Sequence, residues 1–413
     1  MKNYNNITYD NNINLNGFQI RKELIHKLKN RFRSYGFQQI HTPAFEEYDL
    51  YFNMNGTINH DEMIKTIDNR GKVLVLRPDI TIPITQKIAS KNKTLDEEYR
   101  YFYVLDVFRQ TFDDQTRKER TQAGVEYFGN PSPEADAELV ALAIHSLKDL
   151  GLNHFKIEIG HAGFFKELVK ELRLNKQDRN ELKQLIQAKN IPEIEPFLEH
   201  FSIDYPLKKS VQEIPLLYGS PEDVLSRADA IVYNEQMKNE LMNLRKINRI
   251  LNDYEVTNHI VIDLGLINHM DYYSGIIFQG FIENIGKPVL MGGRYDQLAD
   301  QFSANIPAIG FAFEIEALLE SYANSLSIEA HSNDFIIFYE LKQQNNGIKM
   351  ANTLREKDFR VLAYPLHKQK TINHNATYTI IIENNEQNVI KHESIHSFTT
   401  INNLLEIIKE DND

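Results

Sequence analysis

Apolar residues near the start of the chain recur at helical spacing. Within residues 18–35, Leu24, Leu28 and Phe32 lie on one face, and arginines and lysines lie on the other. This pattern predicts an amphipathic helix that ends at Gly36. Runs of β-branched and aromatic residues, bounded by turn residues, predict strands farther along the chain. These are residues 38–42, 73–76, 101–108, 125–128, 155–159, 261–264, 274–281 and 309–313.

The starts of two later helices are marked by their capping residues. Ser132 is a candidate N-cap, Pro133 occupies the first helical position, and Gly151 ends the helix. Ser220 is followed by Pro221 and two acidic residues, which repeats the arrangement. Both segments are therefore predicted to be helices.

The order of these elements predicts two domains. Residues 1–325 form an α+β core, and charged helical segments at about 163–254 are predicted to be an insertion between its strands. The predicted helices of this insertion are 164–174, 178–188, 221–230 and 234–251. Residues 331–413 are predicted to form a small α/β domain. Its expected elements are a strand at 335–339, a helix at 346–357, strands at 360–364 and 378–382, and a helix at 402–409.

The composition narrows the possible functions. The 413 residues include no cysteine, which excludes disulfides, thiolate metal ligands and cysteine nucleophiles. The formal net charge of −12 argues against nucleic acid as the main partner. The longest apolar runs are about five residues and the first residues are polar, so we expect neither a membrane span nor a signal peptide. A cytoplasmic protein without a metal is expected.

Four sequence patches follow one another in the order and spacing of histidyl-tRNA synthetases. The helix, Gly36 and the strand before Pro43 resemble motif 1 of class II aminoacyl-tRNA synthetases, the dimer-interface element. Residues 76–81, together with 108–109 and 122–126, resemble the region that runs into motif 2. The resemblance implies a class II antiparallel sheet flanked by helices, and it covers roughly residues 17–320.

The other two patches resemble the parts of this family that are specific for histidine. Residues 266–275 contain Asp-Tyr-Tyr-Ser-Gly, as in the first histidine motif. Residues 292–296 read Gly-Gly-Arg-Tyr-Asp, and 307–316 resemble motif 3. The segment after Asp334 faintly resembles a shortened anticodon-binding domain, because only a short connection separates Tyr364 from Tyr378.

The resemblance implies a set of histidine-binding residues. In the family, the acid at the position of Asp79 takes the ammonium of the amino acid, and the arginine at Arg109 takes its carboxylate and the α-phosphate. One anion and one cation at fixed separation suit a zwitterion, and a guanidinium binds a carboxylate through two hydrogen bonds. The full set is Asp79, Thr81, Arg109, Gln122, Glu126, Tyr272, Tyr273 and Tyr295.

Each patch also has an interpretation without a ligand. Arg109 could pair with Asp106 or Glu126 on a sheet surface, the two adjacent tyrosines could lie in a half-buried strand, and Gly-Gly could be only a turn. Asp79 also departs from the family, where a glutamate is expected. These alternatives remain open at the level of sequence.

The cationic residues that a synthetase aims at ATP are missing. The arginine of the first histidine motif is Asn268, the motif 3 arginine is Ala317, and its preceding glycine is Glu314. No arginine lies between positions 249 and 294 or between 294 and 355, so a shift of the alignment restores neither cation. Thr111 stands where motif 2 has an acid. Each such donor is worth ~10²–10³ in rate, so we expect no aminoacylation and no catalytic residues.

A retained amino-acid pocket beside a dismantled ATP site resembles the regulatory subunits of short-form ATP phosphoribosyltransferase. This resemblance implies a non-catalytic partner of the catalytic subunit, histidine as effector, a dimer through the motif 1 region, and hetero-octamers. It implies neither a cofactor nor tRNA. The competing hypotheses are a functioning histidyl-tRNA synthetase, another synthetase paralogue, and a scaffold that binds no ligand.

Overall fold

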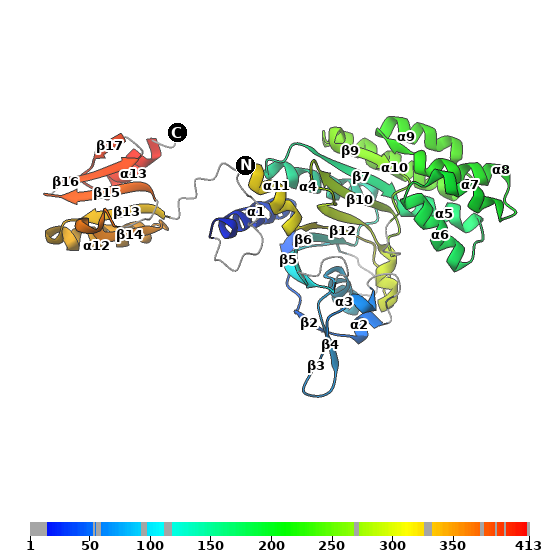
Figure 1. The fold of residues 1–413 in the computed structure, drawn as a ribbon, viewed down its shortest axis with the longest axis horizontal. Coiled ribbons are helices and arrows are strands. Elements are labelled where there is room, and N and C mark those ends of the chain that lie inside the picture. Colours follow the sequence, from blue (N-terminus) through cyan, green and yellow to red (C-terminus); the bar gives the residue numbers. More distant parts are fainter. Residues whose placement is uncertain are drawn as a thin grey trace. The chain divides into compact units, whose positions relative to one another are not determined.

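The chain divides into two compact units, residues 1–326 and 327–413, which are described separately (Figure 1). The computed structural model describes residues 15–52, 54, 59–91, 97–110, 118–267, 272–325, 333–371, 376–384, 386–391 and 394–410. Across these ranges, no helix is both long and apolar enough to cross a membrane.

A nine-stranded sheet forms the centre of the first unit. Its strand order is β1-β5-β6-β12-β11-β10-β7-β9-β8, and its pairs are antiparallel except β1–β5 and β7–β9. The bounds are β1 Gln38–Gln39, β5 Tyr99–Phe108, β6 Glu119–Phe128, β7 Phe155–His161, β8 Tyr218–Gly219, β9 Ile260–Asp263, β10 Ile276–Ile282, β11 Leu290–Arg294 and β12 Ala308–Glu314. The predicted α+β sheet is confirmed, and β6 begins six residues before the strand predicted at 125–128.

Helices cover one face of this sheet. The predicted N-terminal helix is α1 (Leu15–Ser34), and it packs with α4 (Pro133–Asp149) and α11 (Ile315–Ser325). Leu24, Leu28 and Phe32 are fully buried. Gly36 has φ +80°, the left-handed conformation that glycine adopts without strain after a helix end. The apolar side of α1 therefore packs against this face of the sheet.

The other face of the sheet carries a smaller layer. Side chains alternate along β5, so Phe102 faces α1 whereas Tyr103 belongs to a second core. That core contains α3 (Thr81–Lys91), which the sequence analysis did not predict, and the 3-10 helix η5 (Asp296–Phe302). The layer is completed by β2 (Phe45–Glu47), β3 (Lys65–Ile67), β4 (Val73–Leu76), α2 (Asp49–Phe52) and η1 (His60–Glu62).

A helical segment follows β7 (Figure 1). Its helices are α5 Ala162–Glu171, α6 Lys176–Gln187, α7 Ile191–Glu199, α8 Tyr205–Glu213, η2 Ile214–Leu216, α9 Pro221–Ala228, η3 Asp229–Ile231, α10 Glu235–Asp253 and η4 Thr257–His259. The sequence analysis missed α7 and α8. The two predicted caps are confirmed: Ser132 accepts from the backbone N–H of Ala135, and Ser220 from that of Asp223.

The second unit is a five-stranded sheet with helices. Its strand order is β14-β13-β15-β16-β17, with β13 parallel to both neighbours. The elements are β13 Asn333–Tyr339, η6 Leu341–Gln343, α12 Gln344–Arg355, β14 Val361–Pro365, η7 Leu366–Lys368, β15 Ala376–Glu383, β16 Glu386–Lys391, β17 Ser394–Ser397 and α13 Ile401–Glu410. The hairpin β16–β17 was not predicted. Between β14 and β15, the described part of the connection holds only η7.

Candidate functional site

A small cavity opens on the face of the sheet that carries α3. Its volume is about 130 Å³, below the ~300–1,000 Å³ usual for drug-sized ligands. All eight residues predicted to bind histidine line it, and they come from the start of α3, from β6 and from the segments around β5, β10 and β11. The fold therefore brings together residues that lie more than two hundred positions apart in the sequence.

Glu126 lines this cavity and is almost fully buried. Its carboxyl accepts hydrogen bonds from the Thr81 hydroxyl, at 2.6 Å, and from the Tyr295 hydroxyl. Gly310 faces Glu126 on the neighbouring strand, and a Cβ there would lie 2.0 Å from a Glu126 oxygen. The pocket therefore needs glycine at position 310.

Burial raises the pKa of Glu126 from 4.5 to about 8. The hydrogen bonds from Thr81 and Tyr295 lower this pKa and the charge of Asp79 raises it, but desolvation is the largest cause. The folded protein therefore holds a proton on Glu126 at neutral pH.

This shift predicts a stability that falls with rising pH. Between about pH 4.5 and 8 the folded state binds a proton on Glu126 that the unfolded state has lost, so each pH unit costs up to about 1.4 kcal/mol of unfolding free energy. Above the folded pKa the loss levels off. Glu126→Gln should flatten this dependence in urea titrations at pH 5, 6, 7 and 8. Equal slopes for the two proteins would show that Glu126 does not titrate in this window.

Asp79 and Arg109 place opposite charges in the wall of the cavity. One Asp79 oxygen accepts from the backbone N–H of Ile82 at 2.8 Å and so caps α3. The Arg109 Nε donates to the Pro78 carbonyl at 2.8 Å. Burial raises the pKa of Asp79, and the positive charge of Arg109 opposes that rise. The two charged groups required for a zwitterion are thus both present.

The alternative partners for Arg109 have other contacts. The Asp106 carboxylate accepts from Thr121, and Glu126 is held by Thr81 and Tyr295. The geometry therefore favours an Arg109 aimed at the cavity over one paired on the sheet surface.

The two adjacent tyrosines form the aromatic wall of the cavity. Tyr272 and Tyr273 have ring centroids 4.7 Å apart, and Tyr272 contacts the Tyr295 ring edge-on at 5.9 Å. A Cβ on Gly293 would lie 2.8 Å from the Tyr273 ring, so glycine permits this close approach. Asn268 and Asp271, which the sequence analysis singled out, lie outside the described residues.

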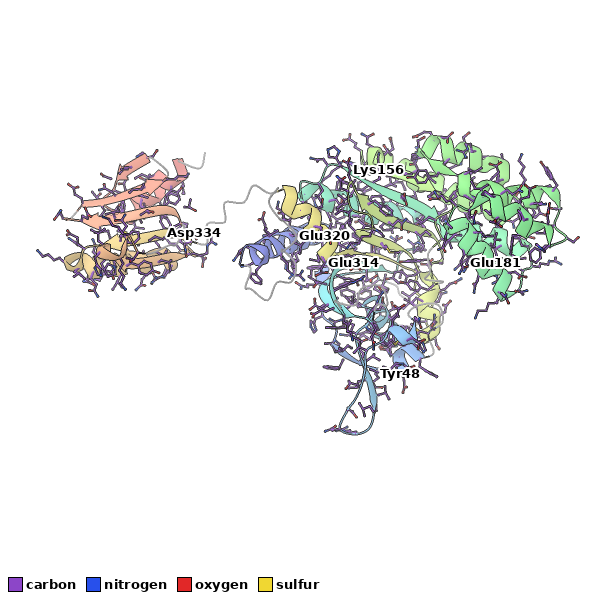
Figure 2. The ribbon with its side chains drawn as sticks, viewed as in Figure 1. Tyr48, Lys156, Glu181, Glu314, Glu320 and Asp334 are labelled. Atoms are coloured by element: carbon purple, nitrogen blue, oxygen red, sulfur yellow. The ribbon has the colours of Figure 1, made fainter. Side chains whose placement is uncertain are left out.

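Glu314 introduces a carboxylate at the end of β12 (Figure 2). It lines the cavity and accepts a hydrogen bond from the Gln122 side-chain amide at 2.7 Å. Ala317, where the family has an arginine, is 2% exposed and packs in the core. Thr111 lies outside the described residues. With Asp79 and Glu126, the described lining of the cavity has three acidic groups and one cation, Arg109.

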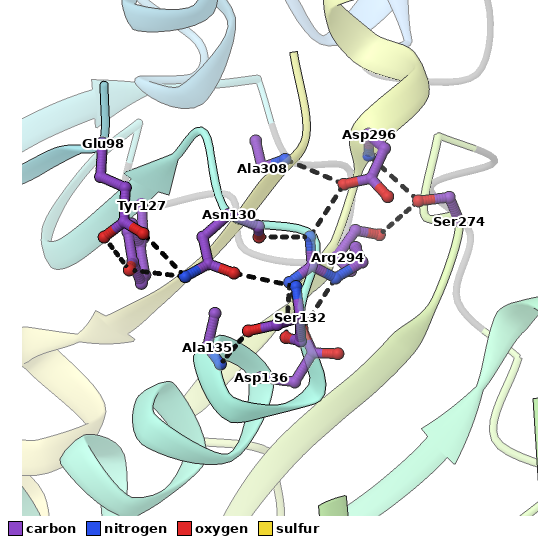
Figure 3. Close-up of polar contacts among 10 residues, drawn as sticks. All are labelled: Glu98, Tyr127, Asn130, Ser132, Ala135, Asp136, Ser274, Arg294, Asp296 and Ala308. Atoms are coloured by element: carbon purple, nitrogen blue, oxygen red, sulfur yellow. Dashed lines mark hydrogen bonds and ion pairs between the residues drawn. The ribbon is translucent and has the colours of Figure 1, made fainter. Parts of the chain in front are cut away.

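The arginine of the Gly-Gly-Arg-Tyr-Asp patch contributes to the fold and does not line the cavity (Figure 3). Arg294 is 4% exposed and donates to Asp136 at 2.8 Å and Asp296 at 3.0 Å. Asp296 in turn accepts from the backbone N–H of Ala308 at 2.9 Å. This network ties β11 to α4 and to the start of β12, so within this patch only Tyr295 reaches the ligand pocket.

Comparison with known proteins assigns the chain to a family. The sequence profile of the histidyl-tRNA synthetase family matches residues 13–318. The chain is 45% identical to an ATP phosphoribosyltransferase regulatory subunit of Oceanobacillus iheyensis, over 94% of this chain and 95% of the relative. It is 36% identical to the one of Acetivibrio thermocellus, over 83% and 82%. The chain belongs to the ATP phosphoribosyltransferase regulatory subunit family.

Solved structures agree with this membership of the regulatory subunit family. A crystal structure described as an ATP phosphoribosyltransferase regulatory subunit/histidyl-tRNA synthetase from Bacillus halodurans matches with a TM-score of 0.75 and 27% identity, over 85% of this chain and 90% of that chain. Histidyl-tRNA synthetase from Nostoc matches with a TM-score of 0.80 at 18% identity, over 95% and 96%, which shows the shared fold.

The sequence analysis missed several residues that line the pocket of this regulatory subunit family member. Tyr103 and Met291 line it but belong to no motif used above, and Phe311 lies in the stretch 307–316 that resembles motif 3 but was given no role. One signal was available for Tyr103, because Gly124 lies opposite it on β6 and a Cβ there would lie 2.4 Å from the Tyr103 hydroxyl. A large aromatic facing a glycine across two strands is typical of a side chain folded over a neighbouring backbone.

Proposed function

We propose that this chain is the regulatory subunit of an ATP phosphoribosyltransferase. A separate short catalytic subunit needs it for activity, and histidine bound to it inhibits the complex. The observation that carries the proposal is the charge pattern of the pocket. Asp79 and Glu314 line it beside Glu126, which holds its proton at neutral pH, with Arg109 as the cation. This arrangement offers a carboxylate to the ammonium and a guanidinium to the carboxylate of a free amino acid.

The same charges oppose a nucleotide. ATP would bring several negative charges towards Glu314 and Asp79, and among the described lining residues Arg109 is the one cation that offsets them. In adenylation, the negative charge that develops on the α-phosphate needs hydrogen-bond donors aimed at it. Ala317, which stands where the family has an arginine, supplies no such donor. The chain is therefore proposed to be non-catalytic, with neither aminoacylation nor tRNA binding.

The aromatic wall supports histidine as the amino acid. Tyr272, Tyr273 and Tyr295 combine flat apolar rings with hydroxyl groups, and these suit an imidazole ring that both stacks and forms hydrogen bonds. Asp79, Thr81 and Gln122 complete the proposed site.

Regulation requires that histidine bind two states of the complex with different affinity. We propose that the motif 1 region around β1 mediates dimer formation, that the complex is a hetero-octamer, and that it works in the cytoplasm beside the catalytic subunit. The second unit, residues 327–413, is proposed to be a shortened relative of the anticodon-binding domain.

The decisive experiment mixes this chain with a short-form catalytic subunit from the same organism. We expect phosphoribosyl-ATP formation to be slow with the catalytic subunit alone, to rise on mixing, and to fall when histidine is added. No change on mixing would refute the partner. Histidine-dependent pyrophosphate exchange on ATP serves as the second readout, and measurable exchange would refute the loss of adenylation.

A further inference from the structure

A second, larger cavity lies between α5 and α6 and adjoins the site described above. Its volume is about 640 Å³, within the ~300–1,000 Å³ typical of small-molecule sites. Tyr273 lines both cavities, so a ligand in one contacts a wall of the other.

The larger cavity is strongly basic, although the chain as a whole carries a net charge of −12. Its described lining includes five cationic side chains and one acidic one, Glu167. Glu167 pairs with Lys170 at 3.5 Å. The cationic residues are Lys166, Lys170, Lys176, Arg179 and Lys183.

The spacing of these residues directs them to one place. On α6, Lys176, Arg179 and Lys183 follow at intervals of three and four and so share one face. On α5, Lys166 and Lys170 do the same. Like charges at these intervals destabilise an isolated helix, so this concentration works against the helices that carry it.

The acids of α6 lie on its other side. Asp178 and Glu181 line a separate hollow together with residues of α7. The helix thus carries its acidic and basic side chains on different sides. Acids three or four residues from Arg179 and Lys183 would have stabilised the helix instead. An anion in the cavity would remove the repulsion that this separation creates.

The cavity also has apolar side chains in its wall. Phe165, Leu266 and Ile277 line it together with Tyr273. Cations beside apolar and aromatic side chains suit a ligand that has phosphate groups and a less polar part.

We propose that this cavity binds a small phosphate-bearing molecule, a nucleotide or a sugar phosphate, and that this binding is separate from the amino-acid pocket. The acidic net charge favours a small ligand over RNA, because an extended polyanion would also meet the acidic remainder of the surface. The shared Tyr273 lets occupancy of this cavity alter the affinity of the neighbouring pocket.

The test is calorimetric titration of the full chain, without a catalytic subunit, with ATP, phosphoribosyl pyrophosphate and inorganic pyrophosphate. At least one should bind with a stoichiometry of one per chain. Lys176→Gln/Arg179→Gln, both exposed in the free protein, should weaken binding on the order of tenfold or more. If pyrophosphate binds more weakly than ATP and phosphoribosyl pyrophosphate, the apolar side chains of the cavity contribute to binding.

Lys209→Gln/Lys246→Gln is the matched control, since it removes the same charge from exposed positions on α8 and α10. Equal weakening in the control would mean general surface attraction and would overturn the proposal. So would no binding of any probe, or binding only of an RNA hairpin with a single-stranded 3′ end. Circular dichroism checks folding, and Lys170→Gln/Lys183→Gln replaces the first variant if it unfolds. Because no catalytic subunit is present, these results stand apart from the test of the proposed function.

Discussion

Arg294→Met is expected to lower the free energy of unfolding by about 3–5 kcal/mol, because it leaves Asp136 buried without its cation. Asp136 is 1% exposed, and burial raises its pKa to about 6 even with Arg294 beside it. The change also releases Asp296 from the network that holds the start of β12. Urea unfolding at pH 7 gives the measurement.

Two controls separate the effect of burying the ion pair from the effect of removing a positive charge. Arg227→Met breaks an exposed ion pair with Asp223 at 2.9 Å and should cost less than ~1 kcal/mol. Removing both partners, in Asp136→Ala/Arg294→Met, should cost less than the sum of the single changes, since no buried carboxylate at position 136 is then left without its cation. A loss below ~1 kcal/mol for Arg294→Met would show that the buried pair does not stabilise the fold.

Arg109→Gln is expected to weaken histidine binding by roughly 10–100-fold, the loss of a charge-assisted contact of ~1.5–3 kcal/mol. Activation of the catalytic subunit should survive, because Arg109 lines the pocket and its one described side-chain hydrogen bond is to Pro78. The measurement is the concentration of histidine that halves phosphoribosyl-ATP formation in the mixed complex.

Arg120→Gln is the matched control for this experiment. Arg120 is exposed on β6 and outside the pocket lining, so the same change of charge should leave inhibition intact. Glu126→Ala provides a second change inside the pocket. If both Arg109→Gln and Glu126→Ala complexes remained fully inhibited by histidine, the sensor would lie elsewhere.

Local sequence determined the elements whose signals are short in range. The caps at Ser132 and Ser220 and the four-residue spacing of Leu24, Leu28 and Phe32 each act within one or two helical turns. They were therefore readable without a structure. The motifs likewise predicted that eight residues share one site, because the order of these motifs along the chain follows the family fold. In the structure all eight line the same cavity.

Local signals failed where the stabilising partner is distant. The sequence of α3 contains Pro83 and several β-branched residues, which disfavour a helix, yet packing against η5 and the cap from Asp79 hold it helical. The strands β16 and β17, at one end of the five-stranded sheet, were missed because largely polar strands lack a clean alternation of apolar residues.

Only the tertiary structure decided what each charged group does. Within one five-residue patch, Arg294 pairs with Asp136, 158 positions away, while Tyr295 turns to Glu126 in the pocket. The basic cavity likewise depends on tertiary structure, because residues of α5, α6 and the start of β10 line it together. The sequence determined which residue types and elements were available, and long-range packing decided which were buried, paired or left open to a ligand, since the free energy of a charge depends on its surroundings.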